Sequence, residues 1–364
     1  MAGSKIRSPK RSSAVTSPAG STSSHQNPRD LLNQAAEFVN CFQNKQALRL
    51  YASALSQLDR LQPTEENQML KIEALQSFGF LLLDEGRFEE AKENLQKAVE
   101  LSPDEGYEKY MYLAQMSKGS EAVALYQVGI DIIKRSLEAT SETDISIQEK
   151  LKRALSNAYC AISEIYTTDL CDEPEAESCC LEAVENAKQA DESNPQAWLS
   201  AANVLAIKAR DDEARQALEK CHSLYWPRVE QAISTIRSRE SGSANAVDND
   251  EEIGAFDLEE LSGIPFGAHL QMATLMMELD MFERAAEILE AMLEEDDGDV
   301  EIFYFLTVIG KKLWVNSDPD RLRHVAEATR ELSAKNGDIE TAKEMEELLA
   351  TLPRNGKSQF LKMK

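Results

Sequence analysis

The pattern over residues 72–103 restricts the fold of this chain more than any other feature of the sequence. Two apolar stripes at helical spacing flank a short polar stretch: Leu75, Phe78 and Leu82, then Ala91, Leu95 and Ala98. Gly79 and Ala91 are small, so two antiparallel helices can approach closely where they cross. Gly86 suits the turn between the helices, and Pro103 ends the second one. The segment therefore predicts a helix–turn–helix unit.

The same internal spacing occurs four times along the chain. The first large residue and the small crossing residue are 16 positions apart in the pairs Leu31/Ala47, Leu75/Ala91, Trp198/Ala214 and His269/Ala285. This spacing resembles the tetratricopeptide repeat, a unit of about 34 residues that needs stacked neighbours to bury its apolar face. We expect an all-α fold: a tetratricopeptide-repeat superhelical solenoid of about seven helix–turn–helix repeats. A C-terminal capping helix with Met345, Leu348 and Leu349 on one face is expected to close it.

Composition divides the chain into an array and its flanks. We expect a disordered basic tail at 1–27, the repeat array at 28–352 and a basic C-terminal tail at 353–364. Residues 239–263 interrupt the repeats with serines, glycines and acids, which predicts a flexible acidic insertion. The bases Lys5, Arg7, Lys10 and Arg11 could form a weak nuclear import signal or simply a polar tail.

The charge of the chain is strongly segregated. The net charge is −25, and the two tails hold eight bases and no acid, so the body between them carries −33. Such a field repels nucleic-acid phosphates and attracts basic partners, so we expect no direct nucleic-acid binding. A surface that is acidic only for solubility is the alternative explanation.

We find no pattern typical of catalysis, metal binding or membrane insertion. The histidines are scattered, the six cysteines lack C-x-x-C spacing, and no phosphate-binding or nucleophile motif occurs. We therefore expect no enzyme, no cofactor, no metal site, and free, buried thiols in a reducing compartment. His269 occupies a packing position and is interpreted as a core residue. No apolar run approaches the ~20 residues of a membrane span.

Acids on the inner, first helices of the repeats are the candidate binding residues. The lysines and asparagines with which some repeats clamp an acidic peptide C-terminus are missing, because those positions hold residues such as Gln76, Phe80, Thr274 and Met277. We predict that a basic client contacts a concave surface and, with the insertion acting as a strap, these acids: Glu73, Asp84, Asp169, Asp248, Asp250, Glu251, Glu252, Glu278 and Glu301.

A family resemblance covers the repeat body. The segments Leu31–Ala35, 72–103 and Asn194–Trp198, together with the more distinctive Leu313–Asp320 stretch, resemble the acidic tetratricopeptide proteins that chaperone the large-subunit ribosomal protein L-four. The resemblance implies a dedicated chaperone that binds the newly made basic protein, shields its basic loop and escorts it from cytoplasm to nucleus, with an import receptor as a further partner. It carries over no residue-level motif.

Two other interpretations stay open at this point. The chain could be a tetratricopeptide adaptor or scaffold in a multiprotein complex that binds an amphipathic helix, or the regulatory subunit of an enzyme. Capture of a basic client should weaken steeply with salt, whereas an apolar helix should stay bound.

Overall fold

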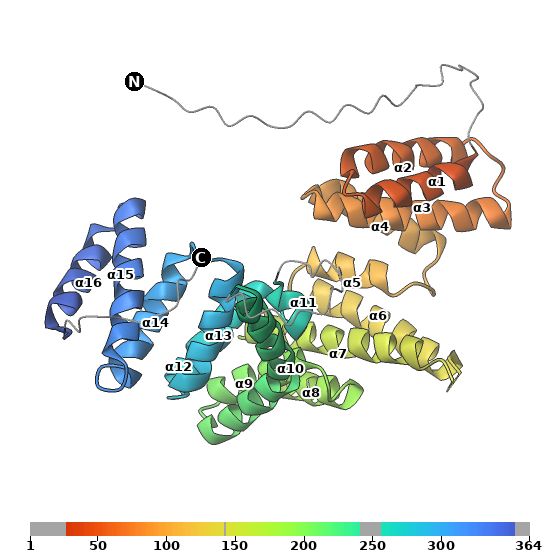
Figure 1. The fold of residues 1–364 in the computed structure, drawn as a ribbon. Coiled ribbons are helices and arrows are strands. Elements are labelled where there is room, and N and C mark those ends of the chain that lie inside the picture. The colour runs from red at the N-terminus through yellow and green to blue at the C-terminus, as the bar shows by residue number, and fades with distance from the viewer. Residues whose placement is uncertain (1–26, 142, 241–255, 354–364) are drawn as a thin grey trace, which may run out of the picture. The chain divides into compact units, whose positions relative to one another are not determined.

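The computed structural model describes residues 27–141, 143–240 and 256–353, and these ranges contain sixteen α-helices and no strand (Figure 1). The chain divides into two compact units, Met1–Pro103 and Asp104–Lys364. Consecutive helices pair within each unit, which gives seven helix pairs in the described residues. This confirms the predicted all-α repeat architecture.

The first unit contains two helix pairs: α1 (Pro28–Asn40) with α2 (Asn44–Leu58), and α3 (Glu65–Asp84) with α4 (Phe88–Leu101). Asn27 caps α1 by accepting a 2.9 Å hydrogen bond from the Asp30 amide, and Pro28 follows at the first helical position, where its missing amide hydrogen is not needed. A cluster of buried apolar residues joins α1, α2 and α3, from Leu31 and Leu32 to Leu81, and α4 buries Ala91, Leu95 and Ala98.

The second unit contains the other five pairs and two further helices. Its helices are α5 (Glu108–Gln115), α6 (Gly119–Ala139), α7 (Ile145–Thr167), α8 (Ala176–Ala190), α9 (Pro195–Ile207), α10 (Asp211–Glu240), α11 (Leu258–Ser262), α12 (Phe266–Glu278), α13 (Phe282–Glu295), α14 (Val300–Leu313), α15 (Pro319–Asn336) and α16 (Ile339–Thr351). The last helix packs on α15, and Met345 is its buried residue, as expected of a capping helix.

One turn geometry explains the recurring 16-residue spacing. In the four repeats with that spacing, the central turn residue is left-handed: Phe42 (φ 55°), Gly86 (φ 73°), Ala209 (φ 53°) and Asp280 (φ 58°). The amide of the next residue then donates to the carbonyl five positions earlier, at 2.8 Å for Gln43 to Phe38, 2.8 Å for Arg87 to Leu82, 2.9 Å for Arg210 to Leu205 and 2.7 Å for Met281 to Met276. This pattern ends the first helix and fixes where the second begins.

The close crossing of α3 and α4 is as predicted. A Cβ added to Gly79 would lie 2.8 Å from the Leu95 side chain and 3.5 Å from the Ala91 carbonyl oxygen. Ala91 itself is fully buried. Because a larger group at either position would collide with the opposite helix, the small residues set the distance between the two axes.

The predicted acidic insertion at 239–263 requires correction at its C-terminal end. Residues Leu258–Ser262 form α11, whose start is capped by Asp257, which accepts a 2.8 Å hydrogen bond from the Glu260 amide. Leu258 and Ile264 are buried in the core of the second unit. Apolar anchoring and a helix cap therefore order a stretch whose acidic composition suggested a solvated loop.

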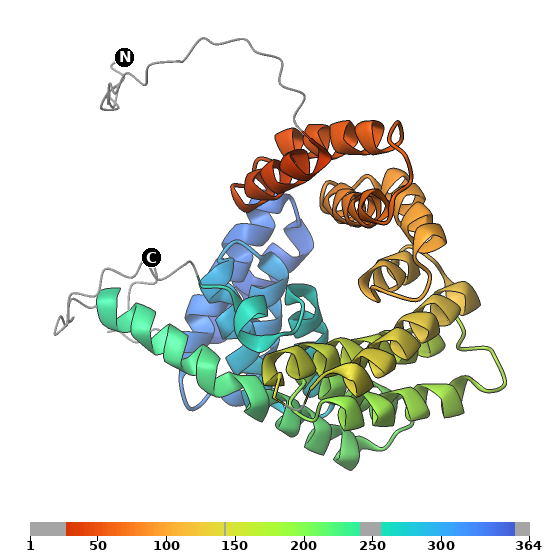
Figure 2. The same cartoon turned by 90° about the vertical axis from the view of Figure 1, so that its right-hand side faces the viewer.

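Helix α10 is longer than a repeat helix. It continues through Pro227 to Glu240, and Val229 is the last buried residue among those whose burial is described. Figure 2 shows the C-terminal half of this helix extending beyond its neighbours.

The cysteines and the hydropathy of the helices give two further findings. All six cysteines are free, but only Cys160, Cys180 and Cys221 are buried, whereas Cys41 and Cys171 are exposed. The expectation of buried thiols is therefore correct for half of them. Among the described residues, no helix is both long and apolar enough to cross a membrane.

Candidate protein-binding surface

Two predicted site residues of the first unit lie on one face of α3. Glu73 and Asp84 are eleven residues apart on this helix, which is three turns or about 16 Å. Both carboxylates are exposed, and within the described residues neither forms an ion pair. Phe80, which shares their face, is partly exposed between them. This face of α3 therefore offers two free carboxylates on either side of an apolar ring.

The three predicted residues of the second unit belong to three repeats. Glu278 ends α12 and Glu301 lies in the first turn of α14; both are exposed and, in the part of the chain that the structure describes, without an ion-pair partner. Asp169 differs, because its carboxylate accepts a 3.0 Å hydrogen bond from the Gly119 amide at the start of α6. Asp169 is therefore already used to join the fourth repeat to the third.

The remaining predicted residues, Asp248, Asp250, Glu251 and Glu252, lie outside the described residues. Their proposed role as a strap stays a prediction.

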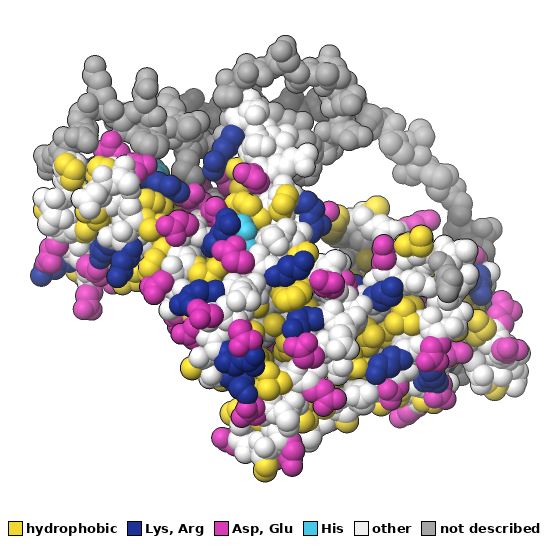
Figure 3. All heavy atoms as spheres, turned by 90° about the horizontal axis from the view of Figure 1, so that it is seen from below, with side chains coloured by type: hydrophobic (Ala, Val, Ile, Leu, Met, Phe, Trp, Pro, Cys, Tyr) yellow, Lys and Arg dark blue, Asp and Glu magenta, His cyan; other side chains and the backbone are white. Residues whose placement is uncertain are grey.

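Many acids on the second helices are engaged in ion pairs instead. Three such pairs connect different helices of the second unit: Arg284 with Glu219, Arg237 with Glu294, and Arg321 with Glu290. On the face shown in Figure 3, Lys and Arg side chains lie among the Asp and Glu side chains rather than apart from them. The free carboxylates at Glu73, Asp84, Glu278 and Glu301 therefore differ from acids that are paired with cations of neighbouring helices.

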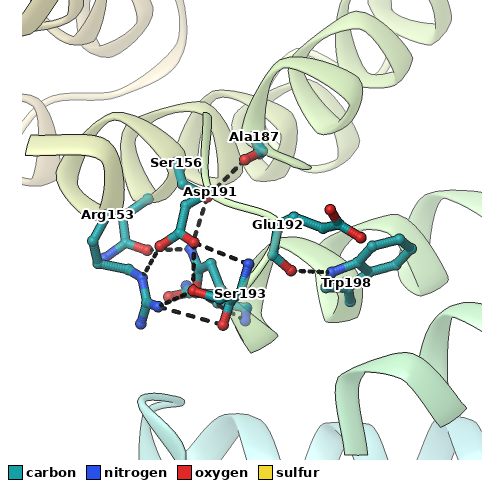
Figure 4. Close-up of polar contacts among 10 residues, drawn as sticks. Arg153, Ser156, Ala187, Asp191, Glu192, Ser193 and Trp198 are labelled. Atoms are coloured by element: carbon teal, nitrogen blue, oxygen red, sulfur yellow. Dashed lines mark hydrogen bonds and ion pairs between the residues drawn. The ribbon is translucent and has the colours of Figure 1, made fainter. Parts of the chain in front are cut away.

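A polar network between the fourth and fifth repeats was not predicted (Figure 4). Arg153 of α7 donates to Asp191 at 2.5 Å, and the same carboxylate accepts from the Ser193 amide at 2.9 Å. Asn194, the cap of α9, donates to Ser156 Oγ and Asn157 Oδ1, both at 2.8 Å. The network fixes the loop that leads into α9.

The same loop positions an aromatic side chain near two cations. Trp198 donates from its indole nitrogen to the Glu192 carbonyl at 2.9 Å (Figure 4). The amines of Lys188 and Lys220 lie 5.3 and 5.8 Å from its ring centroid, within the range of cation–π attraction. The Asn194-Pro195 dipeptide predicts the start of α9, but nothing in the sequence places Arg153 beside it.

The buried histidines are packing residues. His269 lies in the core, and burial lowers its pKa to about 4. His222 stacks on Trp226 with ring centroids 4.7 Å apart; burial and then the nearby Arg284 lower its pKa to about 4. No group of three or more metal-ligating side chains occurs among the described residues. His269 as a core residue is thus confirmed.

Comparison with known proteins agrees with this architecture. The model of the tetratricopeptide repeat matches residues 72–105. Among solved structures, the Assembly Chaperone of RpL4 (Acl4), residues 1–338, superposes with a TM-score of 0.61 and 23% sequence identity over 79% of this chain and 97% of that chain. At this identity the likeness establishes the fold.

Two curated fungal proteins have similar sequences, and each is named "Probable assembly chaperone of rpl4". The Schizosaccharomyces pombe protein is 32% identical over 216 residues, 59% of this chain and 55% of that protein. The Emericella nidulans protein is 23% identical over 313 residues, 82% of this chain and 70% of that protein. The match thus spans about half the length of the first relative. The chain has the tetratricopeptide-repeat fold, and its predicted resemblance to the assembly chaperones of RpL4 is confirmed.

Proposed function

We propose that this chain is a dedicated chaperone of a newly made, highly basic ribosomal protein of the L4 family. It would shield the basic loop of that protein and escort it to the nucleus for large-subunit assembly. The similarity to two proteins named as probable assembly chaperones of rpl4 carries the proposal. The chain would act without catalysis, by holding its client.

The charge of the chain supports a basic client. The body carries −33, and the carboxylates at Glu73, Asp84, Glu278 and Glu301 have no ion-pair partner among the described residues. Exposed, unpaired carboxylates can form charge-assisted hydrogen bonds to lysine and arginine without first breaking a bond of their own. Long-range attraction would also speed the encounter with the client.

Capture of L4 by the purified full-length chain at low and at high salt tests the proposal. The matched control is L4 without its basic internal loop. We expect the chain to capture intact L4, to lose most of it as salt rises, and to bind the loop-deleted protein far less. Salt-independent capture would favour the adaptor interpretation, and equal capture of both L4 forms would remove loop shielding from the proposal.

The escort step has a separate test. A fluorescent fusion of the full chain should accumulate less in the nucleus when Lys5, Arg7, Lys10 and Arg11 are replaced by serine. The matched control replaces Arg354, Lys357, Lys362 and Lys364 by serine, which removes the same charge from the other tail. An unchanged distribution in the first variant would assign nuclear import to the client or to another part of the chain.

A further inference from the structure

Two adjacent hollows lie on the first unit beside α2. Both are shallow and open to solvent: the first, of about 460 Å³, is lined by Phe42, Lys45 and Arg49, and the second, of about 410 Å³, by Lys45, Arg49 and Phe78. Because Lys45 and Arg49 line both, the hollows form one continuous depression. We name it the α2 groove and define it by Phe42, Lys45, Leu48, Arg49, Phe78 and Arg87. Its combined size suits a few side chains of a peptide.

The charge of the α2 groove is opposite to that of the chain as a whole. Lys45 and Arg49 are exposed one helical turn apart, and within the described residues neither has an ion-pair or side-chain hydrogen-bond partner. Of the two acids at the rim, Glu90 is paired with a cation, whereas Glu85 is held by a neutral amide and keeps its charge. Glu85 accepts a 2.8 Å hydrogen bond from Asn44, and Glu90 forms two bonds, at 2.8 and 2.6 Å, with Arg87. The groove therefore presents two free cations.

An apolar residue stands at one end of the groove in an unfavourable backbone conformation. Phe42 has φ 55° and is 93% exposed. A left-handed conformation costs a residue other than glycine about 1 kcal/mol, and exposing a phenylalanine forgoes a further gain from burial. The corresponding turn position of the next repeat holds Gly86, which has no such cost. Ala209 and Asp280 show that other non-glycine residues adopt the same turn, so the turn itself does not require phenylalanine at position 42, and its exposed ring is available for contact with a partner.

We propose that the α2 groove binds a short acidic segment of a partner protein. Two carboxylates of that segment would pair with Lys45 and Arg49, and an apolar side chain between them would pack against Phe42, Leu48 and Phe78. Such a segment differs in sign from the basic client, which Lys45 and Arg49 would repel. The site also differs from the peptide-carboxylate clamp on first helices, because its cations belong to the second helix of a repeat.

Charge favours an acidic protein segment over a nucleic acid. A polyphosphate would bring many charges close to a body of −33, whereas a short segment engages only the two local cations. The apolar floor formed by Leu48 and Phe78 adds contact area that a phosphate backbone cannot use.

The test uses fluorescence anisotropy with the full-length chain. The probe is a short fluorescein-labelled peptide in which a Leu-Phe pair is flanked by aspartates and glutamates. A second peptide replaces these acids by asparagine and glutamine. We expect the acidic peptide to bind, the amide peptide to bind at least about tenfold more weakly, and added salt to reduce the difference.

Three variants locate the binding. Lys45→Glu with Arg49→Glu should weaken binding by about tenfold or more, whereas Lys97→Glu, an exposed and unpaired lysine of α4, should change it less than about twofold. Phe42→Gly should weaken binding several-fold while the protein stays at least as stable, because glycine adopts the same turn without strain.

Equal binding of both peptides, or binding that survives the Lys45/Arg49 reversal, would overturn the proposal. Because this inference concerns a second surface, its failure leaves the proposed function intact. Capture of L4 by the Lys45→Glu/Arg49→Glu variant distinguishes a failure of this inference from a failure of the proposed function. Unchanged or stronger capture is expected, because the reversal removes two cations that repel a basic client; loss of capture would assign the α2 groove to the client and overturn the acidic-segment assignment.

Discussion

At the residue scale, backbone strain in the repeat turns gives a direct stability prediction. Ala209 has φ 53° in the turn between α9 and α10, and its side chain is exposed. Ala209→Gly should raise the free energy of unfolding by up to about 1 kcal/mol, because glycine adopts this conformation without a Cβ clash. The reverse change, Gly86→Ala, should lower the free energy of unfolding by a similar amount. An added Cβ there meets nothing within 4 Å, so the only cost is that of the left-handed backbone conformation. Urea denaturation measures both; equal shifts of one sign would contradict the strain account.

The two buried histidines predict how stability depends on pH. Their pKa values fall to about 4 in the folded chain, chiefly through burial, from an unfolded value of about 6.5. The unfolded state therefore binds protons first, so folding stability falls as pH drops from about 6.5 towards 4. Between pH 7 and 5 each histidine should cost about 2 kcal/mol or less.

A variant isolates this contribution. His269→Leu removes one titrating group from the core at little change in volume, so the loss of stability between pH 7 and 5 should shrink by the share of that histidine. Denaturation midpoints at the two pH values provide the measurement. A pH dependence identical to that of the unmodified chain would assign the effect to other groups.

At the element scale, the helix crossing in residues 72–103 is a closely packed contact. Ala91→Trp would force α4 away from α3, since Ala91 is fully buried against the crossing and Gly79 leaves no spare room. We expect a loss of several kcal/mol, or failure to fold. Lys97→Trp, on the exposed side of the same helix, is the matched control and should leave the melting curve nearly unchanged. A normal melting curve for Ala91→Trp would contradict the crossing.

The elements that sequence predicts well are those fixed by local geometry. A three-residue turn with one left-handed residue sets the 16-residue spacing, so the helix pairs around Ala91 and Ala214 can be found without tertiary information. Helix α11 was not predicted, because five residues are too few to show a periodic apolar stripe. Its acids resemble those of a solvated loop, but Asp257 caps the helix and Glu259 accepts a 3.1 Å hydrogen bond from the Phe266 amide.

The candidate site likewise contains residues that local sequence predicts and residues whose role depends on distant partners. The free carboxylates Glu73 and Glu278 were predictable from their positions on first helices. The structural use of Asp169 was not, because its partner Gly119 is 50 residues away in the sequence. The α2 groove was also missed: Lys45 and Arg49 are a visible pair one turn apart, but the apolar floor beside them comes partly from α3. Contacts between residues far apart in the sequence could not be predicted, because no local pattern in a single sequence indicates them.

At the scale of the whole molecule, the question is whether net charge or the position of the charge selects the client. Neutralising Glu73, Asp84, Glu278 and Glu301 as Glu→Gln and Asp→Asn removes four charges from first helices. The control neutralises Glu93, Glu138, Glu182 and Glu230, which are exposed, unpaired acids on second helices within the described residues. Both variants lose the same charge from a body of −33. If only long-range attraction matters, the loss of four charges should therefore weaken L4 capture equally in the two variants.

Local recognition predicts a different result. If the client contacts first helices, the first set should weaken capture about tenfold, through slower binding and faster release, while the second set should slow binding only slightly. Surface-plasmon measurements of both rates at one salt concentration separate these cases. Asp169 is left unchanged because its hydrogen bond to Gly119 would confound the comparison with a loss of stability. Equal weakening by the two sets would mean that the acidic body acts as a whole, with no defined binding face on the first helices.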